Sequence, residues 1–313
     1  MLHGSWPSPA ARDEDDERGR VTRAVRAQVD AGLELVTDGQ VRWQDLSQAL
    51  LGALDDGDTG PSGLLVRSWR DTAEIAAGMT HAGTPPATVA AVVTGPFTLA
   101  RVRGDPSLTV TLAERVGGEL AALAGAGCAM VVVDEPDAVA IGSDEAGRRQ
   151  FRDGQRALLG DEPPLHRMLA ITGGSASEAG HDMILEAPYH SYLFDLVAGP
   201  DNWYLVRAAP GDRGIVCGAL RAPSAADQAP LLVWAARYAA SANGRGLERV
   251  GLANASPLGD LDESSARASL EALAAAARLA ALEPDDAVAA GLDRRTFAQP
   301  PGRGARPRRL PPA

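Results

Sequence analysis

Two kinds of segment alternate along most of this sequence, and that alternation constrains the fold more than any other feature. Short runs rich in Val, Ile, Leu and Met end at polar residues or at Gly and Pro, and each is too short for a helix. Ala-, Leu- and Arg-rich stretches between them carry apolar residues at helical spacing. The short runs predict strands at residues 33–37, 89–93, 130–133, 168–172, 183–185, 214–220 and 249–253, with a further strand at 2–5 that is too brief for the pattern alone to assign. The longer stretches predict helices at 18–31, 108–127, 148–160, 189–198, 229–243 and 264–282.

Repeated units of a strand followed by a helix predict a parallel sheet. Eight such units in about 285 residues fit a single α/β domain folded as a closed (β/α)8 TIM barrel, which usually takes roughly 250 residues. An open, doubly wound sheet is the alternative, but no G-x-G-x-x-G follows an early strand. We therefore expect one barrel over residues 1–290, with a short hairpin at 64–69 inside an insertion, and a disordered Pro/Arg-rich tail over 291–313.

Charge and composition exclude several classes of function. The chain of 313 residues has a net charge of −11, which argues against nucleic-acid binding and against a basic membrane-binding patch. No apolar run approaches the ~18 residues of a membrane span, and the acidic N-terminus lacks the features of a secretory signal. All 30 basic residues are arginines, so a lysine Schiff base and a P-loop lysine are excluded. Cys128 and Cys217 lie in apolar runs, as reduced core thiols of a cytoplasmic protein would.

Polar residues follow nearly every predicted strand, and a barrel of this kind has its active site at those strand ends. Asp134 and Glu186 each follow an apolar run, and a carboxylate in that position is costly unless it is paired or solvated. A helix cap is the alternative role for Asp134 and Glu135. From their common position we predict that His3, Gln40, Asp134 and Glu186 face one cleft.

Four of these corners carry motifs in a fixed order along the chain. They are His3-Gly4-Ser5-Trp6-Pro7, the segment VDAGLELVTDGQVRWQD at residues 29–45, Thr94-Gly95-Pro96-Phe97-Thr98-Leu99, and Val133-Asp134-Glu135-Pro136. Together they resemble the catalytic barrel of cobalamin-independent methionine synthase, in the superfamily that also holds uroporphyrinogen decarboxylase. The resemblance extends from His3 to about residue 280, so it covers nearly the whole predicted barrel.

The resemblance implies a reaction and a set of site residues. In that family a methyl group moves from a methylated folate to the thiol of homocysteine, which is activated by a zinc ion held by His, Cys, Glu and a second Cys. Ala170 and Thr172 stand where the family has its His and first Cys ligands, and the corner NASPLGDL, where the second Cys belongs, contains no Cys. At best Glu186 matches a ligand of the family. We therefore assign no metal ligands and leave the cofactor unknown. Without zinc, the acceptor must be more acidic than an alkyl thiol or be deprotonated by Glu186 or Asp134, and we expect these two residues as the catalytic groups. We expect a substrate pocket of His3, Gly4, Ser5, Gln40, Asp134 and Glu135.

Three functions follow as alternatives. The first is a divergent, zinc-independent methyltransferase that passes a methyl group from a folate-type donor to a thiol or another small acceptor. The second is a non-catalytic barrel that binds folate or an amino acid, or that is a partner of an intact paralogue. The third is a true cobalamin-independent methionine synthase with an unusual ligand set, such as His166, Glu186 and His190.

Overall fold

The structure is a computed structural model, and it describes residues 1–8, 17–56, 60–79, 86–160, 164–223 and 228–282. The tail predicted over residues 291–313 lies outside these ranges. No helix in the described ranges is long and apolar enough to cross a membrane.

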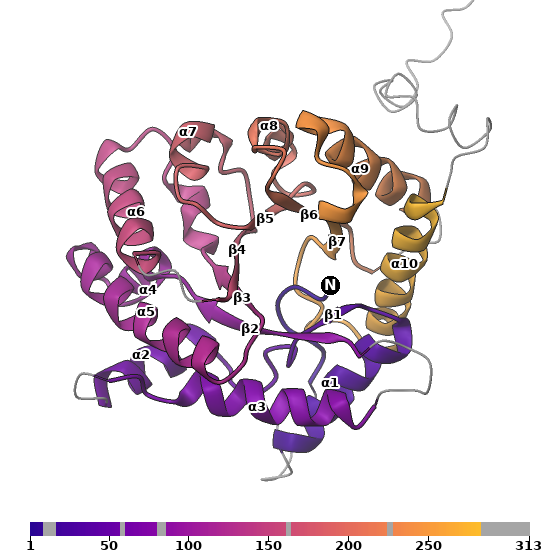
Figure 1. Ribbon diagram of the computed structural model, residues 1–313, viewed down its shortest axis with the longest axis horizontal. Coiled ribbons are helices and arrows are strands. Elements are labelled where there is room, and N and C mark those ends of the chain that lie inside the picture. Colours follow the sequence, from indigo (N-terminus) through magenta and orange to yellow (C-terminus); the bar gives the residue numbers. More distant parts are fainter. Residues whose placement is uncertain (9–16, 57–59, 80–85, 161–163, 224–227, 283–313) are drawn as a thin grey trace, which may run out of the picture.

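Seven parallel strands form one curled sheet in which each strand pairs with the next one along the chain (Figure 1). This arrangement is an α/β barrel fold, as predicted, although strand pairing does not close the described sheet into a ring. The strands are β1 (Leu35–Val36), β2 (Thr88–Thr94), β3 (Met130–Asp134), β4 (His166–Ile171), β5 (Ser191–Asp195), β6 (Gly214–Leu220) and β7 (Val250–Asn254).

Helices surround the outside of the sheet (Figure 1), where they cover its outward apolar side chains. Two of the longest start at aspartate caps: Asp144 accepts from Ala146 and Gly147, and Asp262 accepts from Ser265. The helices are α1 (Glu17–Ala31), α2 (Leu46–Asp56), α3 (Leu64–Ala77), α4 (Pro96–Val102), α5 (Thr109–Gly125), α6 (Glu145–Leu158), α7 (His181–Ile184), α8 (Trp203–Ala208), α9 (Ala229–Ser241) and α10 (Glu263–Ala281).

The first residues of the chain lie in the gap between β7 and β1, although they do not form the predicted strand at 2–5. The amino group of Met1 donates to the carbonyl of Leu252 at 2.6 Å. The backbone of His3 is held by the side chain of Asn254, whose Oδ1 accepts from the His3 N–H and whose Nδ2 donates to the His3 carbonyl. Hydrogen bonds from the Asn254 side chain thus take the place of some backbone hydrogen bonds that an eighth strand would make with β7.

Two adjacent predictions are wrong in element type. The run at 183–185 is not a strand, because α7 covers His181–Ile184, and the predicted helix at 189–198 contains β5 instead. An apolar run this short fits either a strand or a turn of helix. All five residues of β5 are buried, so they show no period that separates a strand from a helix. The predicted hairpin at 64–69 lies within α3, and it is also wrong.

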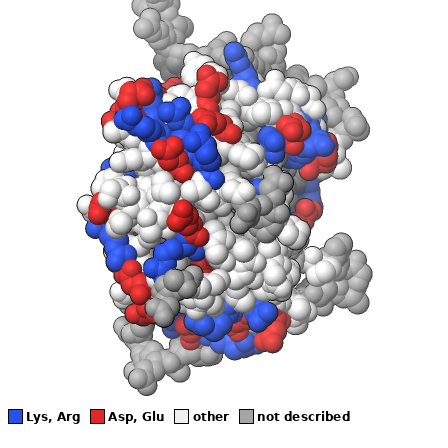
Figure 2. Space-filling view, turned by 60° about the vertical axis from the view of Figure 1, so that its left-hand side comes forward, with Lys and Arg blue, Asp and Glu red and all other residues white. Residues whose placement is uncertain are grey.

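Opposite charges are mixed on the face that Figure 2 shows, where basic and acidic side chains lie beside one another. Pairs such as Arg103 with Asp55, whose nearest atoms are 2.6 Å apart, are partly exposed to water. Exposed pairs of this kind contribute little to stability, so the fold depends mainly on the buried apolar core.

Candidate functional site

The carboxyl end of the curled sheet carries a polar layer above an apolar lumen. A small apolar cluster, distinct from the main core, fills the lumen and includes Val132, Met168 and Ala170. Alternate residues of a strand face the same side of a sheet, so Asp134 points inward two residues beyond Val132. Thr94 pairs with Asp134 in the β2–β3 register, so the two residues stand at the same height along the sheet, and Thr94 is buried.

His3 and Asp134 meet at this end. The Nε2 of His3 lies 3.6 Å from Oδ1 of Asp134, although one residue belongs to the N-terminal segment and the other to β3. The exposed fraction is 7% for the His3 side chain and 18% for that of Asp134. Oδ1 of Asp134 is buried and accepts no hydrogen bond from the described residues. A buried carboxylate oxygen without a donor is costly, and a bound ligand could supply that donor.

Burial changes the charge state of this pair. Desolvation, and next the negative charge of Glu135, raise the pKa of Asp134 to about 7. Desolvation, and next the positively charged N-terminus, lower the pKa of His3 to about 4. Between these two values both side chains are mainly neutral, so the 3.6 Å contact is not a stable ion pair. A carboxyl group with a pKa near neutrality can give or take a proton at physiological pH.

Glu135 points away from the lumen and holds the start of α4. Its Oε1 accepts from the backbone N–H of Phe97 at 3.1 Å, and its Oε2 accepts from that of Thr98 at 2.8 Å. These are unpaired donors of the first turn of α4, whose N-cap residue, Gly95, has no side chain to satisfy them. Glu135 therefore caps α4 from a neighbouring strand end, and its side chain does not cap the helical turn that follows it at Pro136–Ala140.

A buried polar chain continues outward from Glu135. Gln155 of α6 donates from Nε2 to Oε1 of Glu135 at 2.7 Å, and its own Oε1 accepts from the hydroxyl of Tyr189. Burial raises the pKa of Glu135 to about 7, against the opposing effect of hydrogen bonds from Thr98, Phe97 and Gln155. Both oxygens of Glu135 are thus engaged by the protein itself. The substrate-contact role predicted for Glu135 stays a prediction.

The other predicted pocket residues lie in turns near the same end. Gly4 has a φ of +72°, and a Cβ there would lie 2.8 Å from Pro257, so the corner requires glycine. The carbonyl of Ser5 accepts from the N–H of Leu258. Gln40 has a φ of +51° in the turn after Gly39. Gly4 and Ser5 thus adjoin the corner after β7, and Gln40 follows β1. Both corners lie at the carboxyl end of the sheet, which we call the mouth. The roles of these three residues toward a substrate stay predictions.

Glu186 does not follow a strand, and in this respect the prediction is wrong. It lies between α7 and β5, on the side where β5 begins, whereas Asp134 is at the opposite, carboxyl end of β3. Its carboxylate is paired with Arg156 at 3.1 Å and with Arg152 at 3.9 Å, and its side chain is 45% exposed. The predicted single cleft of His3, Gln40, Asp134 and Glu186 is therefore not formed, because residues 183–185 are helical.

The residues at the mouth do not fit a zinc site of the implied type. Ala170 and Thr172 stand at two of the matching positions, and neither is a ligand that zinc takes up in proteins. The rings of His166 and His190 are 5.1 Å apart, where β4 and β5 begin, and they form no group with Glu186. In the described part of the chain, no three His, Cys, Asp or Glu side chains could hold a metal ion together.

Two residues of this region were not singled out from the sequence. Gln155 is one polar position within an amphipathic helix, and its pattern does not distinguish it from surface residues. Asn254 directly follows the strand predicted at 249–253, within the corner NASPLGDL. An Asn after a buried run, before Ala-Ser-Pro, is the one signal that pointed toward it.

The fold of this chain is shared by solved structures, although its sequence matches no known family. No family model and no curated protein matches the sequence. Solved structures do match the fold. A B12-independent methionine synthase from Shewanella sp. W3-18-1, in complex with selenomethionine, has a TM-score of 0.70 at 14% identity, over 89% of this chain and 96% of that one.

Two further structures share the fold. A putative vitamin-B12 independent methionine synthase from Listeria monocytogenes has a TM-score of 0.65 at 15% identity, over 85% of this chain and 87% of that one. A methyltransferase from Methanosarcina mazei has a TM-score of 0.55 at 12% identity, over 84% and 86%. The resemblance that the corner motifs indicated is therefore confirmed at the level of the fold.

Proposed function

We propose that this protein is a methyltransferase-like enzyme whose substrate site is the polar layer at the carboxyl end of the sheet. The observation that carries the proposal is Asp134, a buried carboxyl group whose Oδ1 lacks a donor and faces His3 across the mouth. The fold supports it, because solved structures with this fold include methionine synthases and a methyltransferase.

The proposed substrate is an amino acid or a related small molecule with a thiol or another acidic acceptor group. One structure with this fold is a complex with selenomethionine, which supports a ligand of that size. An ammonium group would supply the donor that Oδ1 of Asp134 lacks. The free, buried Cys128 and Cys217 support a cytoplasmic setting.

The proposed reaction is methyl transfer from a folate-type donor without zinc of the family type. The acceptor loses its proton to a base, and its new bond to the methyl carbon forms as the donor's N–CH3 bond breaks. The donor nitrogen keeps the electron pair of that bond and takes up a proton, so one methyl group and one proton are exchanged overall. Burial raises the pKa of Asp134 to about 7, which suits a base at neutral pH. An ammonium group bound to Asp134 would lower that pKa, so holding an ammonium group and taking this proton are alternative roles of Asp134. Because no ligand set of the family type is present, no step is assigned to a metal.

Calorimetric titration with L-methionine and L-homocysteine tests the site. We expect Asp134→Asn to weaken binding by about 1.5–3 kcal/mol, roughly tenfold to a hundredfold, because it removes a charge-assisted hydrogen bond. Asp55→Asn is the matched control, since Asp55 pairs with Arg103 on the surface of α2. Equal affinities of wild type and Asp134→Asn would refute the site.

A non-catalytic binding barrel is the second candidate, and one observation favours it. Gln40 stands where the resembling family has a carboxylate, so the mouth lacks one acidic contact for an amino acid. Turnover separates the two functions. Methyl transfer from 5-methyltetrahydrofolate to homocysteine in the presence of a chelator supports the enzyme, whereas binding of either compound without transfer supports the binding barrel.

A further inference from the structure

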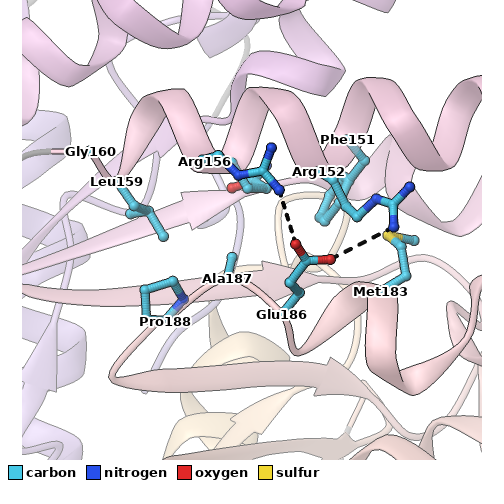
Figure 3. Close-up of a pocket in the computed structure, with 10 residues that line it drawn as sticks. Phe151, Arg152, Arg156, Leu159, Gly160, Met183, Glu186, Ala187 and Pro188 are labelled. Carbon is cyan, nitrogen blue, oxygen red and sulfur yellow. Dashed lines mark hydrogen bonds and ion pairs between the residues drawn. The ribbon is translucent and has the colours of Figure 1, made fainter.

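A cavity of about 210 Å³ lies between α6 and the connection from α7 to β5, outside the sheet and away from Asp134. Its apolar lining includes Phe151 and Leu159 of the α6 region and Met183 of α7. Arg152, Arg156 and Glu186 stand around it (Figure 3). The cavity thus combines apolar surface with charged groups, as small-molecule sites usually do.

Two arginine side chains at this cavity hold the carboxylate of Glu186. Arg156 reaches Oε1 of Glu186 at 3.1 Å, while Arg152 approaches Oε2 at 3.9 Å, so the two guanidinium groups contact different oxygens of one carboxylate (Figure 3). Arginine matches the planar geometry of a carboxylate better than lysine does. Glu186 therefore occupies a position that a carboxylate from a ligand would fit equally well.

Displacing the carboxylate of Glu186 from the two arginines costs little free energy. The side chains of Arg152, Arg156 and Glu186 are 40%, 69% and 45% exposed, and ion pairs at such exposure are weak because water competes for both partners. Glu186 follows α7, a helix of four residues, and its side chain can turn into water. Arg156 also contacts Asp153 at 3.4 Å, so it keeps one anionic neighbour when Glu186 leaves.

We propose that this cavity binds a small monocarboxylate with an apolar body. The carboxylate replaces that of Glu186 between Arg152 and Arg156, and the apolar body packs against Phe151, Leu159 and Met183. Inorganic phosphate fits less well, because it gains nothing from the apolar lining and loses more hydration on entry. This inference does not depend on the function proposed for the mouth.

The test compares hexanoate with hexanol, hexylamine and inorganic phosphate in titrations of the full chain, followed by two-dimensional NMR. We expect saturable binding of hexanoate at one site, with shifts at the methyl groups of Leu159 and Met183. Hexanol, hexylamine and phosphate should bind more weakly. Equal binding of hexanol would reduce the cavity to a non-specific apolar site and overturn the proposal.

Substitutions at the rim should act in opposite directions. Arg152→Gln with Arg156→Gln should weaken hexanoate binding by about threefold to tenfold, because partly exposed charge pairs have modest strength. Glu186→Gln should strengthen it, since the competing carboxylate is removed. Arg149→Gln, an exposed position on the same helix, is the control and should change nothing.

The double arginine variant and Glu186→Gln are independent tests, so one of them suffices if the other is poorly folded. Circular dichroism checks each protein before titration. Unchanged affinity in the double arginine variant, weaker binding in Glu186→Gln, or absence of hexanoate binding from both wild type and Glu186→Gln would each overturn the proposal.

Discussion

Gly95 leaves the space that the carboxylate of Glu135 occupies: a Cβ at Gly95 would lie 2.3 Å from Oε1 of Glu135. Glycine at this corner and glutamate at the end of β3 thus depend on each other. The two motifs that contain them, Thr94-Gly95-Pro96 and Asp134-Glu135-Pro136, are far apart in the sequence and pack directly against each other. Part of what resembles a catalytic pattern is therefore a requirement of the fold.

Gly95→Ala should be strongly destabilising. The added methyl group displaces the Glu135 carboxylate from the first turn of α4, which leaves buried donors unpaired, and we expect a loss of about 3 kcal/mol in the free energy of unfolding. Chemical denaturation measures it. Gly52→Ala is the control with the opposite sign: nothing lies within 4 Å of a Cβ in that helix, so stability should rise by about 0.5–1 kcal/mol.

Glu135→Gln should destabilise the protein although the side chain keeps its shape. Three donors, from Phe97, Thr98 and Gln155, converge on the two oxygens of Glu135, and a glutamine amide group would face at least one of them. A loss of about 2 kcal/mol is expected from one unpaired buried donor and one repulsive contact. Urea denaturation measures it, with the exposed Glu114→Gln as control; equal losses in both variants would contradict the capping role.

Asp134→Asn should change how stability depends on pH. The pKa of Asp134 is raised from 3.8 to about 7, so its contribution to stability is complete at low pH and is lost as the pH rises through about 7. Asn cannot ionise and avoids that loss. Relative to wild type, the variant should gain up to about 4 kcal/mol between roughly pH 4 and pH 8, because each tenfold change in proton affinity corresponds to about 1.4 kcal/mol. Urea denaturation across this range checks it, and a constant difference would contradict burial of the charge.

His3→Gln should change how stability depends on pH in the acidic range, measured by the same urea denaturation. The pKa of His3 is lowered from 6.5 to about 4, so its contribution is complete above its ordinary value and is lost as the pH falls through about 4. Wild type should lose stability relative to His3→Gln over that interval, by about 1–3 kcal/mol. A stability difference between the two proteins that stays constant from pH 7 down to pH 4 would show that His3 is not buried in its neutral form.

Asn254→Ala should release the N-terminal segment. The Asn254 side chain makes hydrogen bonds to the N–H and carbonyl of His3 and to the carbonyl of Ser256, and it is fully buried. We expect a loss of about 3 kcal/mol and faster hydrogen exchange at the amides of His3 and Trp6. Exchange in β3 should be affected only through global unfolding. Slow exchange at His3 in the variant would show that other contacts hold the segment.

The sequence by itself determined the α/β class, the parallel sheet and six of its strands, because short buried runs between helical stretches have few other ways to bury their apolar residues. It also placed Asp134 at a strand end. Tertiary structure decided what local pattern could not. Within residues 183–198, a helix stands where a strand was predicted and a strand stands where a helix was predicted, because the apolar residues of neither run show a periodicity that distinguishes the two. Glu186 consequently faces Arg152 and Arg156, and Glu135 turned outward to cap α4, because side-chain partners distant in sequence are chosen by packing alone.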